Sequence, residues 1–356
     1  MKKSNLLLIV FFLTIVSCKD PIRNECHESI VLEEFIYQIE DAQTSQVHAP
    51  SIAESGGIIV SAWFGGTEEK NDDVSIWVSR KVEGEWSVPL EVANGVQKDG
   101  SRYPSWNPVL FKPENKPLIL FYKVGPNPQE WWGLYVTSED DGSSWSEPIK
   151  LPDEIYGPIK NKPVQLSNGD ILSPTSTEHD GWKIQIERST DGGKTWKSTG
   201  DLNDTEEFEA IQPTIIIHSN DTLQILCRTK NSVISESWSG DSGYTWSKMI
   251  ATDLPNPNSG IDAVSLKDKR ALLVYNPTDN NWGMRVPLSV AVSPAGKHWK
   301  EFIELESVTE LQAADKEEYS YPSIIQTSDG LVHIVYTWNR ETVKHVVLDP
   351  AKIDRN

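Results

Sequence analysis

One short element recurs along the chain and constrains its fold more than any other feature. It has the form S-x-D-x-G-x-x-W and is clearest at Ser189–Trp196 (STDGGKTW). Full copies stand at Ser138–Trp145 and Ser239–Trp246, and worn copies without the Asp stand at Ser79–Trp86 and Ser293–Trp299. We call this element the Asp box. The closing tryptophans are 50 to 59 residues apart, and self-similarity at such a period predicts a repeat architecture.

The residues of the Asp box predict a tight turn that carries its own small core. Ser and Asp side chains hydrogen-bond to nearby backbone N–H groups, and Gly supplies a positive φ angle. The closing Trp folds back under the turn as an apolar plug. We therefore expect the boxes to hold the fold together and to take no part in chemistry.

Between the boxes, short apolar strands alternate with turns that are rich in Gly or Asn, as hairpins require. No long helical period appears, so the predicted fold class is all-β. The second strand of each unit is the easiest to recognise, and six are predicted: Ile58–Trp63, Leu118–Tyr122, Asp170–Pro174, Leu223–Cys227, Ala271–Tyr275 and Val332–Tyr336.

Five units with boxes and a final partial unit, Tyr319–Leu348, make six repeats. The strand near Ile30–Ile39 can supply the outer strand of the last repeat, which would close the ring and remove an exposed sheet edge. The sequence therefore predicts a six-bladed β-propeller over residues 30–350. A seven-bladed ring is the alternative, and the number of repeats argues against it.

The first 18 residues have the composition of a secretory signal. Two lysines precede an apolar run, Leu6–Val16, which ends at Ser17-Cys18 and resembles a bacterial lipobox. We expect cleavage before Cys18, lipidation of that residue and a lipoprotein anchored at the periplasmic or outer surface of a bacterium, with residues 19–29 as a polar tether. An ordinary signal peptide or a single anchor helix is the alternative, although the run is shorter than the roughly 20 residues that span a bilayer.

Charge and cysteine content exclude several classes of partner. The net charge is −19 and the pI about 4.8, which argues against nucleic acid or an anionic membrane surface. Contact with a membrane is expected through the N-terminal lipid alone. No spacing of Cys and His is typical of a zinc site, and no metal or organic cofactor is indicated. We expect a monomer, and an acidic ligand would need a local cluster of arginines.

Polar residues open the predicted inner strands, which in a propeller converge on the central axis and line one mouth of its channel. The capping of strand ends would explain one or two of these residues, but the whole set predicts a polar pocket. The openings are Val47-His48-Ala49-Pro50, Ser105-Trp106-Asn107-Pro108, Asn161-Lys162-Pro163, Ile211-Gln212-Pro213, Ser259-Gly260-Ile261-Asp262 and Tyr319-Ser320-Tyr321-Pro322.

The boxes, the six-unit plan and several local strings resemble the sialidase (neuraminidase) superfamily, in its bacterial BNR-repeat branch. The resemblance covers nearly all of Ile30–Leu348. It implies that arginines bind a sugar carboxylate, since a planar guanidinium matches a carboxylate bidentately. Arg228 and Arg285 stand where two arginines of the family stand. The first arginine is replaced by His48, which cannot act as a permanent bidentate donor.

The resemblance also assigns candidate catalytic residues. Asp73 resembles the acid/base of the family, with a solvated loop carboxylate as the plainer interpretation. Tyr319 matches the tyrosine nucleophile, although Tyr321 could instead be the one that faces inward. The family's partner of the tyrosine is a glutamate, and this chain has Gln212 there, which cannot act as a base. Glu178, at the end of a second strand, could replace it.

Three further residues are candidate contributors to substrate binding: Lys162 at an inner-strand opening, Arg340 after a second strand, and Trp63 as a surface for sugar stacking. The resemblance implies an exo-acting glycosidase that removes a terminal acidic sugar, a sialic acid or a related ulosonic acid. Two alternatives remain open. The site could act on another uronate-containing glycan as a glycosidase or lyase with His48 as acid/base, or the protein could bind surface glycans without turnover.

Overall fold

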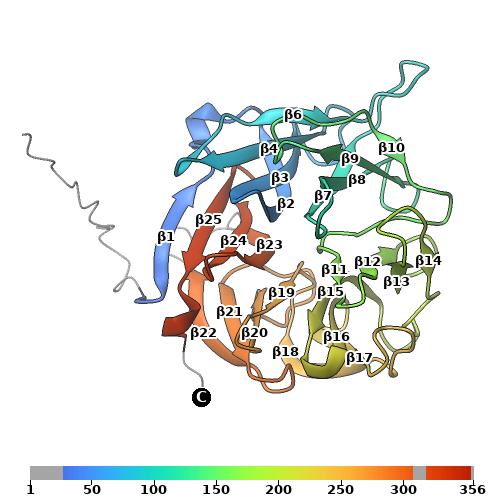
Figure 1. Cartoon of the computed structure of the whole chain (residues 1–356), viewed down its shortest axis with the longest axis vertical. Coiled ribbons are helices and arrows are strands. Elements are labelled where there is room, and N and C mark those ends of the chain that lie inside the picture. The colour runs from blue at the N-terminus through green and yellow to red at the C-terminus, as the bar shows by residue number, and fades with distance from the viewer. Residues whose placement is uncertain (1–26, 308–317, 354–356) are drawn as a thin grey trace, which may run out of the picture.

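The computed structural model describes residues 27–307 and 318–353. Within these ranges the chain is all-β, and 25 strands form six antiparallel sheets around a central axis (Figure 1), with three short 3-10 helices outside the sheets. Each sheet is one blade, so the predicted six-bladed β-propeller is confirmed. The predicted signal segment 1–18, with Cys18, lies outside the described residues. In the described part of the chain, no helix is both long and apolar enough to cross a membrane.

The two strands of each blade that lie nearest the axis carry the candidate site. From blade 1 to blade 6, the innermost strands are β2 (Gln46–Ser55), β7 (Ser105–Phe111), β11 (Val164–Gln165), β15 (Ala210–Ile217), β19 (Asp262–Ser265) and β23 (Tyr319–Gln326). The second strands are β3 (Ile58–Gly66), β8 (Leu118–Val124), β12 (Ile171–Thr177), β16 (Leu223–Thr229), β20 (Ala271–Tyr275) and β24 (Val332–Trp338). All six second strands overlap the predicted ranges.

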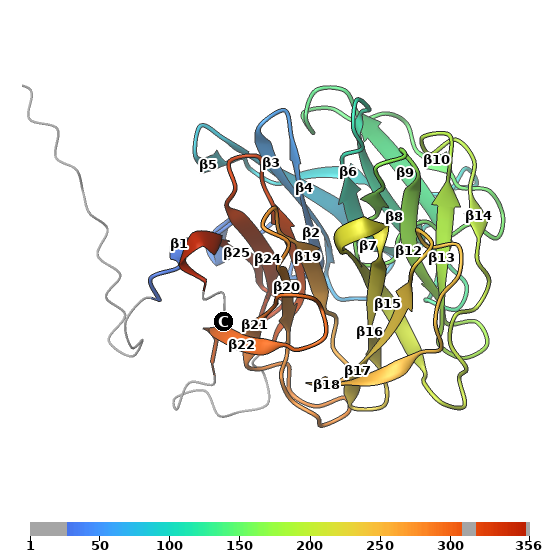
Figure 2. The ribbon, with the colours of Figure 1, turned by 60° about the horizontal axis from the view of Figure 1, so that its bottom comes forward.

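The two outer strands of each blade complete the sheets. Figure 2 shows the ring tilted by 60°, so that the length of the strands can be followed. The third strands are β4 (Ser75–Val82), β9 (Trp132–Ser138), β13 (Lys183–Ser189), β17 (Val233–Ser239), β21 (Leu288–Ser293) and β25 (Thr342–Leu348). The outermost strands are β5 (Glu85–Trp86) with β6 (Leu90–Ala93), β10 (Ile149–Lys150), β14 (Lys197–Ser198), β18 (Ile250–Pro255), β22 (Lys300–Glu306) and β1 (Ile30–Phe35).

The ring closes by pairing the N-terminal strand with the last blade, as the sequence predicts. β1 runs antiparallel to β25 and forms the outer edge of blade 6. A partly buried polar cluster ties this edge to blade 1, because the Glu34 carboxylate accepts hydrogen bonds from Trp86 Nε1 (2.8 Å) and Lys81 and lies 2.8 Å from His345 Nδ1. The closure therefore joins the two ends of the propeller through charge as well as through the strand ladder.

The Asp boxes are turns at the end of the ring where the third strands finish, and we call this the box end. In the box at Ser189–Trp196, Asp191 accepts bonds from Thr195 N (2.9 Å) and Thr195 Oγ1 (2.6 Å), and Ser189 Oγ accepts from Gly193 N (2.8 Å). Trp196 packs against the apolar cluster between blades 2 and 3. This box thus satisfies the polar groups of its own turn and packs against the seam to the preceding blade.

The opposite end, where the inner strands begin, is the mouth. Four inner strands open with the same β-bulge, in which a residue other than Gly adopts a left-handed conformation directly before Pro. These residues are Ala49, Asn107, Gln212 and Tyr321, with φ between 41° and 55°. A bulge redirects a side chain out of the regular alternation of a strand. This shared bulge is what turns Gln212 and Tyr321 toward a common partner at the mouth.

Below the mouth, the Asp262 carboxylate on β19 binds the inner strands together at the axis. It accepts bonds from Lys162 Nζ (2.8 Å), Thr214 Oγ1 (2.8 Å) and Ile324 N (3.0 Å), which belong to blades 3, 4 and 6. Asp262 is fully buried. The axis is therefore held by one satisfied charge cluster, on which the candidate site rests.

Candidate functional site

Arg228, at the end of β16, is the centre of the site at the mouth. Its side chain is buried, and its guanidinium donates to Asn258 Oδ1 (2.6 Å), Gln212 Oε1 (3.3 Å) and Tyr321 Oη (2.7 Å). All three partners are uncharged, and among the described residues Arg228 has no carboxylate as a paired counter-ion. Burial lowers the pKa of Arg228 below its ordinary value, but an arginine remains charged at neutral pH. The mouth thus contains a buried cation whose described hydrogen-bond partners are all uncharged, with the Glu178 carboxyl group close enough to interact with its charge.

Tyr321 and His48 pack against each other beside Arg228. Their ring centroids lie 4.2 Å apart with the planes tilted by 50°, and Phe64 meets His48 edge to face. His48 Nδ1 lies 3.1 Å from Thr337 Oγ1, and the same hydroxyl accepts from the backbone N–H of Ala49. Because the Ala49 N–H fixes the Thr337 hydroxyl, the contact with this hydroxyl holds the imidazole in one orientation.

Glu318 holds two more arginines at the site. Its carboxylate accepts from Arg285 (2.8 Å) and from Arg340 Nε (2.8 Å), and it also accepts from Ser320 Oγ (2.6 Å). Arg340 makes a second ion pair with Glu69 (2.7 Å). Because these ion pairs are partly buried, they hold the side chains of Arg285 and Arg340 in place at the site.

The electrostatics of this cluster keep Glu318 ionised and His48 neutral. Burial alone would raise the pKa of the Glu318 carboxyl, but its contacts with His48, Arg285 and Arg340 hold the pKa well below the ordinary value. For His48, burial and the positive charge of Arg340 lower the pKa well below its ordinary value, although Glu318 opposes this. At neutral pH His48 is therefore an uncharged imidazole among three arginines.

An aromatic wall and one carboxyl group flank Arg228 on the side of blade 3. The Arg228 guanidinium lies 5.3 Å from the ring of Trp182 and 5.6 Å from the ring of Trp282, and these two rings meet edge to face. Trp282 is 61% exposed. Glu178 accepts from Trp182 Nε1 (3.1 Å), and burial raises its pKa above the ordinary value. Glu178 is therefore a carboxyl group at the site that holds its proton more readily than usual.

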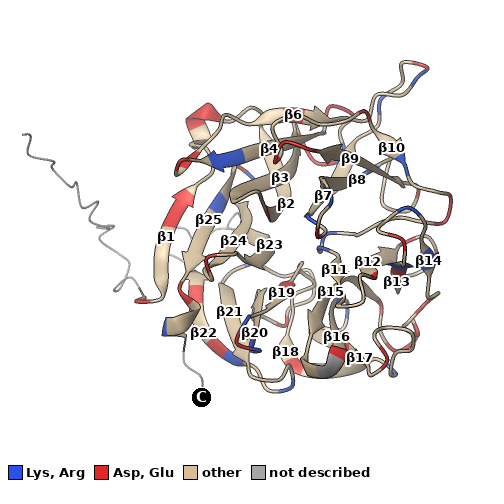
Figure 3. Cartoon of the chain, viewed as in Figure 1, with Lys and Arg blue, Asp and Glu red and all other residues tan. Residues whose placement is uncertain are grey.

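Two lysines support the site from below. Lys160 is buried and donates to Asn161 Oδ1 (2.9 Å), to the carbonyl of Ile261 (2.6 Å) and to the carbonyl of Pro322, directly after Tyr321. Burial lowers the pKa of Lys160 to about 7. Lys162, a predicted binding residue, is instead paired with Asp262 at the axis. Figure 3 shows basic segments reaching the centre of the ring near β11, which follows these lysines.

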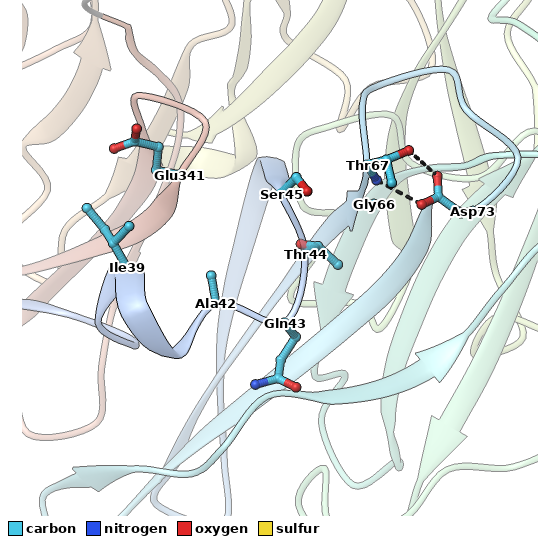
Figure 4. Close-up of a pocket in the computed structure, with 9 residues that line it drawn as sticks. All are labelled: Ile39, Ala42, Gln43, Thr44, Ser45, Gly66, Thr67, Asp73 and Glu341. Carbon is cyan, nitrogen blue, oxygen red and sulfur yellow. Dashed lines mark hydrogen bonds between the residues drawn. The ribbon is translucent and has the colours of Figure 1, made fainter.

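Asp73, the predicted acid/base, is not among the described partners of Arg228. Its carboxylate accepts from Thr67 N (2.9 Å) and Thr67 Oγ1 (3.0 Å) within its own loop. It lines a surface pocket of about 500 Å³ between the loop before β2 and the loop after β3, together with Gln43, Thr44 and Ser45 (Figure 4). The described contacts of Asp73 thus stabilise a loop at the rim of the mouth.

The structure separates the predicted residues into two groups. It brings together His48, Gln212, Arg228, Arg285, Arg340 and Tyr321, with Glu178 close by. Tyr319, two residues before Tyr321, instead packs in the apolar cluster between blades 5 and 6. Trp63 is 1% exposed and packs on Tyr37 in the core beside blade 1, so it offers no surface to a sugar. The bulge between Ser320 and Ser323 interrupts the strand alternation that would otherwise place Tyr319 and Tyr321 on the same side, so Tyr321, and not Tyr319, faces the mouth.

Sequence reasoning did not find Glu318, Lys160 or the pair Trp182 and Trp282. Glu318 directly precedes the Tyr319-Ser320-Tyr321 string, and this position next to an inner-strand opening could have predicted its place at the mouth. Trp282 lies in an irregular loop between β20 and β21, where no pattern distinguished it from the many structural tryptophans. Among the described residues, no group of three His, Cys, Asp or Glu side chains could hold a metal ion.

Comparisons with known proteins agree with the fold. None of the curated proteins matches the chain. A solved protein of unknown function from Dyadobacter fermentans has a TM-score of 0.72 at 17% identity, covering 90% of this chain and 98% of the other. The NanB sialidase of Streptococcus pneumoniae has a TM-score of 0.72 at 13% identity, covering 90% and 71%. An intramolecular trans-sialidase of Ruminococcus gnavus has a TM-score of 0.69 at 13% identity, covering 88% and 96%.

These identities are low, so the likeness to solved structures shows the fold alone. A family model gives more, because the model of the BNR repeat-like domain matches residues 57–334, most of the chain. Since this match covers more than half of the chain, the chain belongs to the BNR repeat-like domain family.

Proposed function

We propose that the protein is a glycosidase that removes a terminal acidic sugar, whose carboxylate binds at Arg228. The observation that supports this proposal is the buried Arg228 guanidinium, whose partners are all neutral. A buried charge without a counter-ion costs several kcal/mol, on the order of 3 to 5. A ligand carboxylate would offset that cost and would match the planar guanidinium. Arg285 and Arg340 add positive charge around the same position.

In this proposal Tyr321, rather than Tyr319, is the nucleophile. The Tyr321 oxygen attacks the anomeric carbon while the bond to the leaving oxygen breaks, and its proton passes to the neutral His48. Glu178, whose pKa is raised, gives its proton to the leaving oxygen. Water then attacks the anomeric carbon and displaces Tyr321, one proton of the water returns to Glu178, and His48 returns its proton to the phenol. The exposed Trp282 offers a stacking face to the sugar chain.

A second candidate is a lyase that acts on a uronate. It is favoured by one observation, namely that the Tyr321 hydroxyl contacts Arg228 while the position of the family's glutamate is Gln212. A lyase needs no such carboxylate, because His48 or Tyr321 could remove the proton next to the carboxylate that Arg228 neutralises. The leaving oxygen would then take a proton, and a carbon–carbon double bond would form in the product.

The test compares Tyr321→Phe with Tyr319→Phe, two changes of one hydroxyl that lie two residues apart. The wild type and both variants are incubated with glycans that end in sialic acid, other ulosonic acids or uronic acids, and the products are weighed by mass spectrometry. We expect release of a hydrated acidic sugar, a loss of about 10³-fold or more in kcat for Tyr321→Phe, and nearly full activity for Tyr319→Phe.

Each of the other outcomes identifies another function. A product lighter by one water, with the ultraviolet absorbance of a conjugated double bond, would select the lyase. Binding of an acidic glycan without any product would select a lectin-like role. Equal loss of kcat in both tyrosine variants would contradict the assignment of Tyr321 as nucleophile.

A further inference from the structure

A second pocket lies at the box end, on the seam between blades 4 and 5 and on the opposite face from Arg228. It encloses about 840 Å³, and its walls include His218, Trp238, Ile250, Lys269 and Lys297. Each of these residues stands where a strand begins or ends at the box end, as at the end of β17 or in the turn between β19 and β20. None of them takes part in the site at the mouth.

The worn box of blade 5 explains why this seam is open. At the seam between blades 3 and 4, Arg188 directly precedes a box and lies 3.9 Å from the ring of Tyr244 in the next box. It also donates to the carbonyl of Ser242, which closes the seam. At the seam between blades 4 and 5, the corresponding residues are Trp238 and Lys297, and the Lys297 ammonium is 5.7 Å from the Trp238 ring. The worn box is one residue shorter and has no Asp.

Trp238 forms a rigid aromatic surface in this pocket. His218 stacks on it with ring centroids 5.0 Å apart and planes 24° from parallel. His218 Nε2 lies 2.9 Å from Gln224 Oε1, and the buried Gln224 in turn donates to Glu236 (2.6 Å) and to the carbonyl of Gly296 (2.8 Å). Because His218 is held in place by this chain of hydrogen bonds, the indole is fixed before any ligand arrives.

The charges of the pocket favour an anion in a protein that is strongly acidic overall. Lys269 and Lys297 are both exposed at its rim. Glu236 is the acidic residue in its wall, and it is engaged by the Gln224 amide. Two lysines against one bonded carboxylate leave a local positive charge, whereas the whole chain carries −19.

We propose that this pocket is a second, non-catalytic carbohydrate site that binds an acidic sugar residue. The apolar face of the pyranose packs on Trp238, and its carboxylate or sulfate pairs with Lys269 and Lys297. A rigid aromatic face next to placed polar groups is the usual composition of such a site. The site holds a glycan on one face of the ring and does not depend on the activity at the mouth.

The experiment measures binding by calorimetry in the Arg228→Met variant, in which the anion site at the mouth is removed. The probes are sialyllactose, a uronate disaccharide, its sulfated form, and lactose as the neutral control. We expect the acidic probes to bind with an affinity that falls as salt is added, and lactose to bind at least tenfold more weakly. Within the acidic set, the preference identifies carboxylate or sulfate as the anion.

Two sets of variants in the same background test the residues. Trp238→Ala should weaken binding at least tenfold, and Lys269→Glu with Lys297→Glu should do the same without a change in thermal unfolding, since both lysines are exposed. Three results would overturn the proposal. They are unchanged binding in both sets of variants, no binding of acidic probes to Arg228→Met without further changes, and equal affinity for lactose. Failure of the proposed activity at the mouth would leave these binding measurements unaffected.

Discussion

Two arginines at opposite ends of the ring show how differently the chain treats a buried charge. Arg188, at the box end, pairs with Asp170, donates to the carbonyl of Ser242 and stacks on Tyr244. Arg228, at the mouth, is buried more deeply and has neutral hydrogen-bond partners. The first charge has an ion-pair partner within the fold, whereas the second has no ion pair among the described residues.

The two arginines differ in how the free-energy cost of burying their charge is offset. A buried ion pair is satisfied within the fold, so removing one partner leaves the other exposed to the full desolvation cost. A buried cation with neutral partners already bears that cost, and an anionic ligand reduces it. Arg188 therefore contributes to stability, while Arg228 is expected to reduce stability in favour of binding.

Replacing each arginine with methionine gives the largest expected effects. Arg228→Met should lower kcat/KM by about 10²- to 10³-fold and leave the melting temperature unchanged or higher. Arg188→Met leaves Asp170 unpaired and should cost about 3 kcal/mol of folding free energy with nearly full activity at a temperature where it is folded. Activity assays and thermal unfolding measure the two effects.

These two variants serve as controls for each other. If Arg228→Met lowered the melting temperature as much as Arg188→Met, the contrast between the two ends would be wrong. Arg228 would then be a structural residue.

Glu318 offers a smaller test, because it acts on substrate through other residues. Glu318→Gln should raise KM about tenfold, since Arg285 and Arg340 lose the carboxylate that positions them. Glu318 also raises the pKa of His48, so its removal lowers that pKa further. Activity that depends on neutral His48 should therefore persist to lower pH in the variant, as a pH profile of kcat/KM would show.

The conservative variant Glu318→Asp separates position from charge. It keeps the negative charge and should restore the pH profile while restoring KM only in part. An unchanged acidic limb in Glu318→Gln would argue against a role for His48 in turnover.

The smallest effect is expected at the exposed boxes. The hydrogen bonds from Thr195, above all, hold the pKa of Asp191 well below its ordinary value. A carboxyl group with a lowered pKa in the folded state stabilises the fold above its unfolded pKa of about 4, and this contribution disappears as the pH falls toward the folded value. Asp191→Asn should thus lower the melting temperature slightly at pH 7.

The difference between this variant and the wild type should shrink as the pH falls below about 4. Thermal unfolding from pH 7 to pH 3 measures the difference in melting temperature. Arg188→Met, also at the box end, serves as the reference for a larger loss of stability. A difference that stayed constant across this range would mean that the box is stabilised by its shape and not by the charge of Asp191.

Much of the fold could be predicted because its signals are local. The box of Asp191 uses bonds between residues no more than four positions apart, and its closing Trp196 recurs at a regular interval. The site was predictable only in part. His48, Gln212 and Arg228 were found because they stand at the ends of recognisable strands. Tyr321 was an alternative to Tyr319, since the two residues lie two positions apart and the bulge between Ser320 and Ser323 decides which side chain faces the mouth.

Glu318 and Asp73 show the limit most clearly. Glu318 binds Arg285 and Arg340. This role could not be predicted from the sequence, because only the arrangement of blades 5 and 6 places the three residues together. Asp73 fits a family pattern, yet its side chain turns to Thr67 in its own loop. Pairing between distant residues depends on the geometry of the closed ring, which no local pattern contains.

The sequence by itself determined the number of blades, their boxes and the strand ends at which polar residues gather. These properties follow from the turn chemistry and apolar periodicity of neighbouring residues. The tertiary structure decided that Arg228 donates to uncharged partners, that Tyr321 faces the mouth and that one worn box leaves a pocket beside Trp238. The reason is that burial and charge pairing are set by residues far apart in the chain, and only closure of the ring brings those residues into contact.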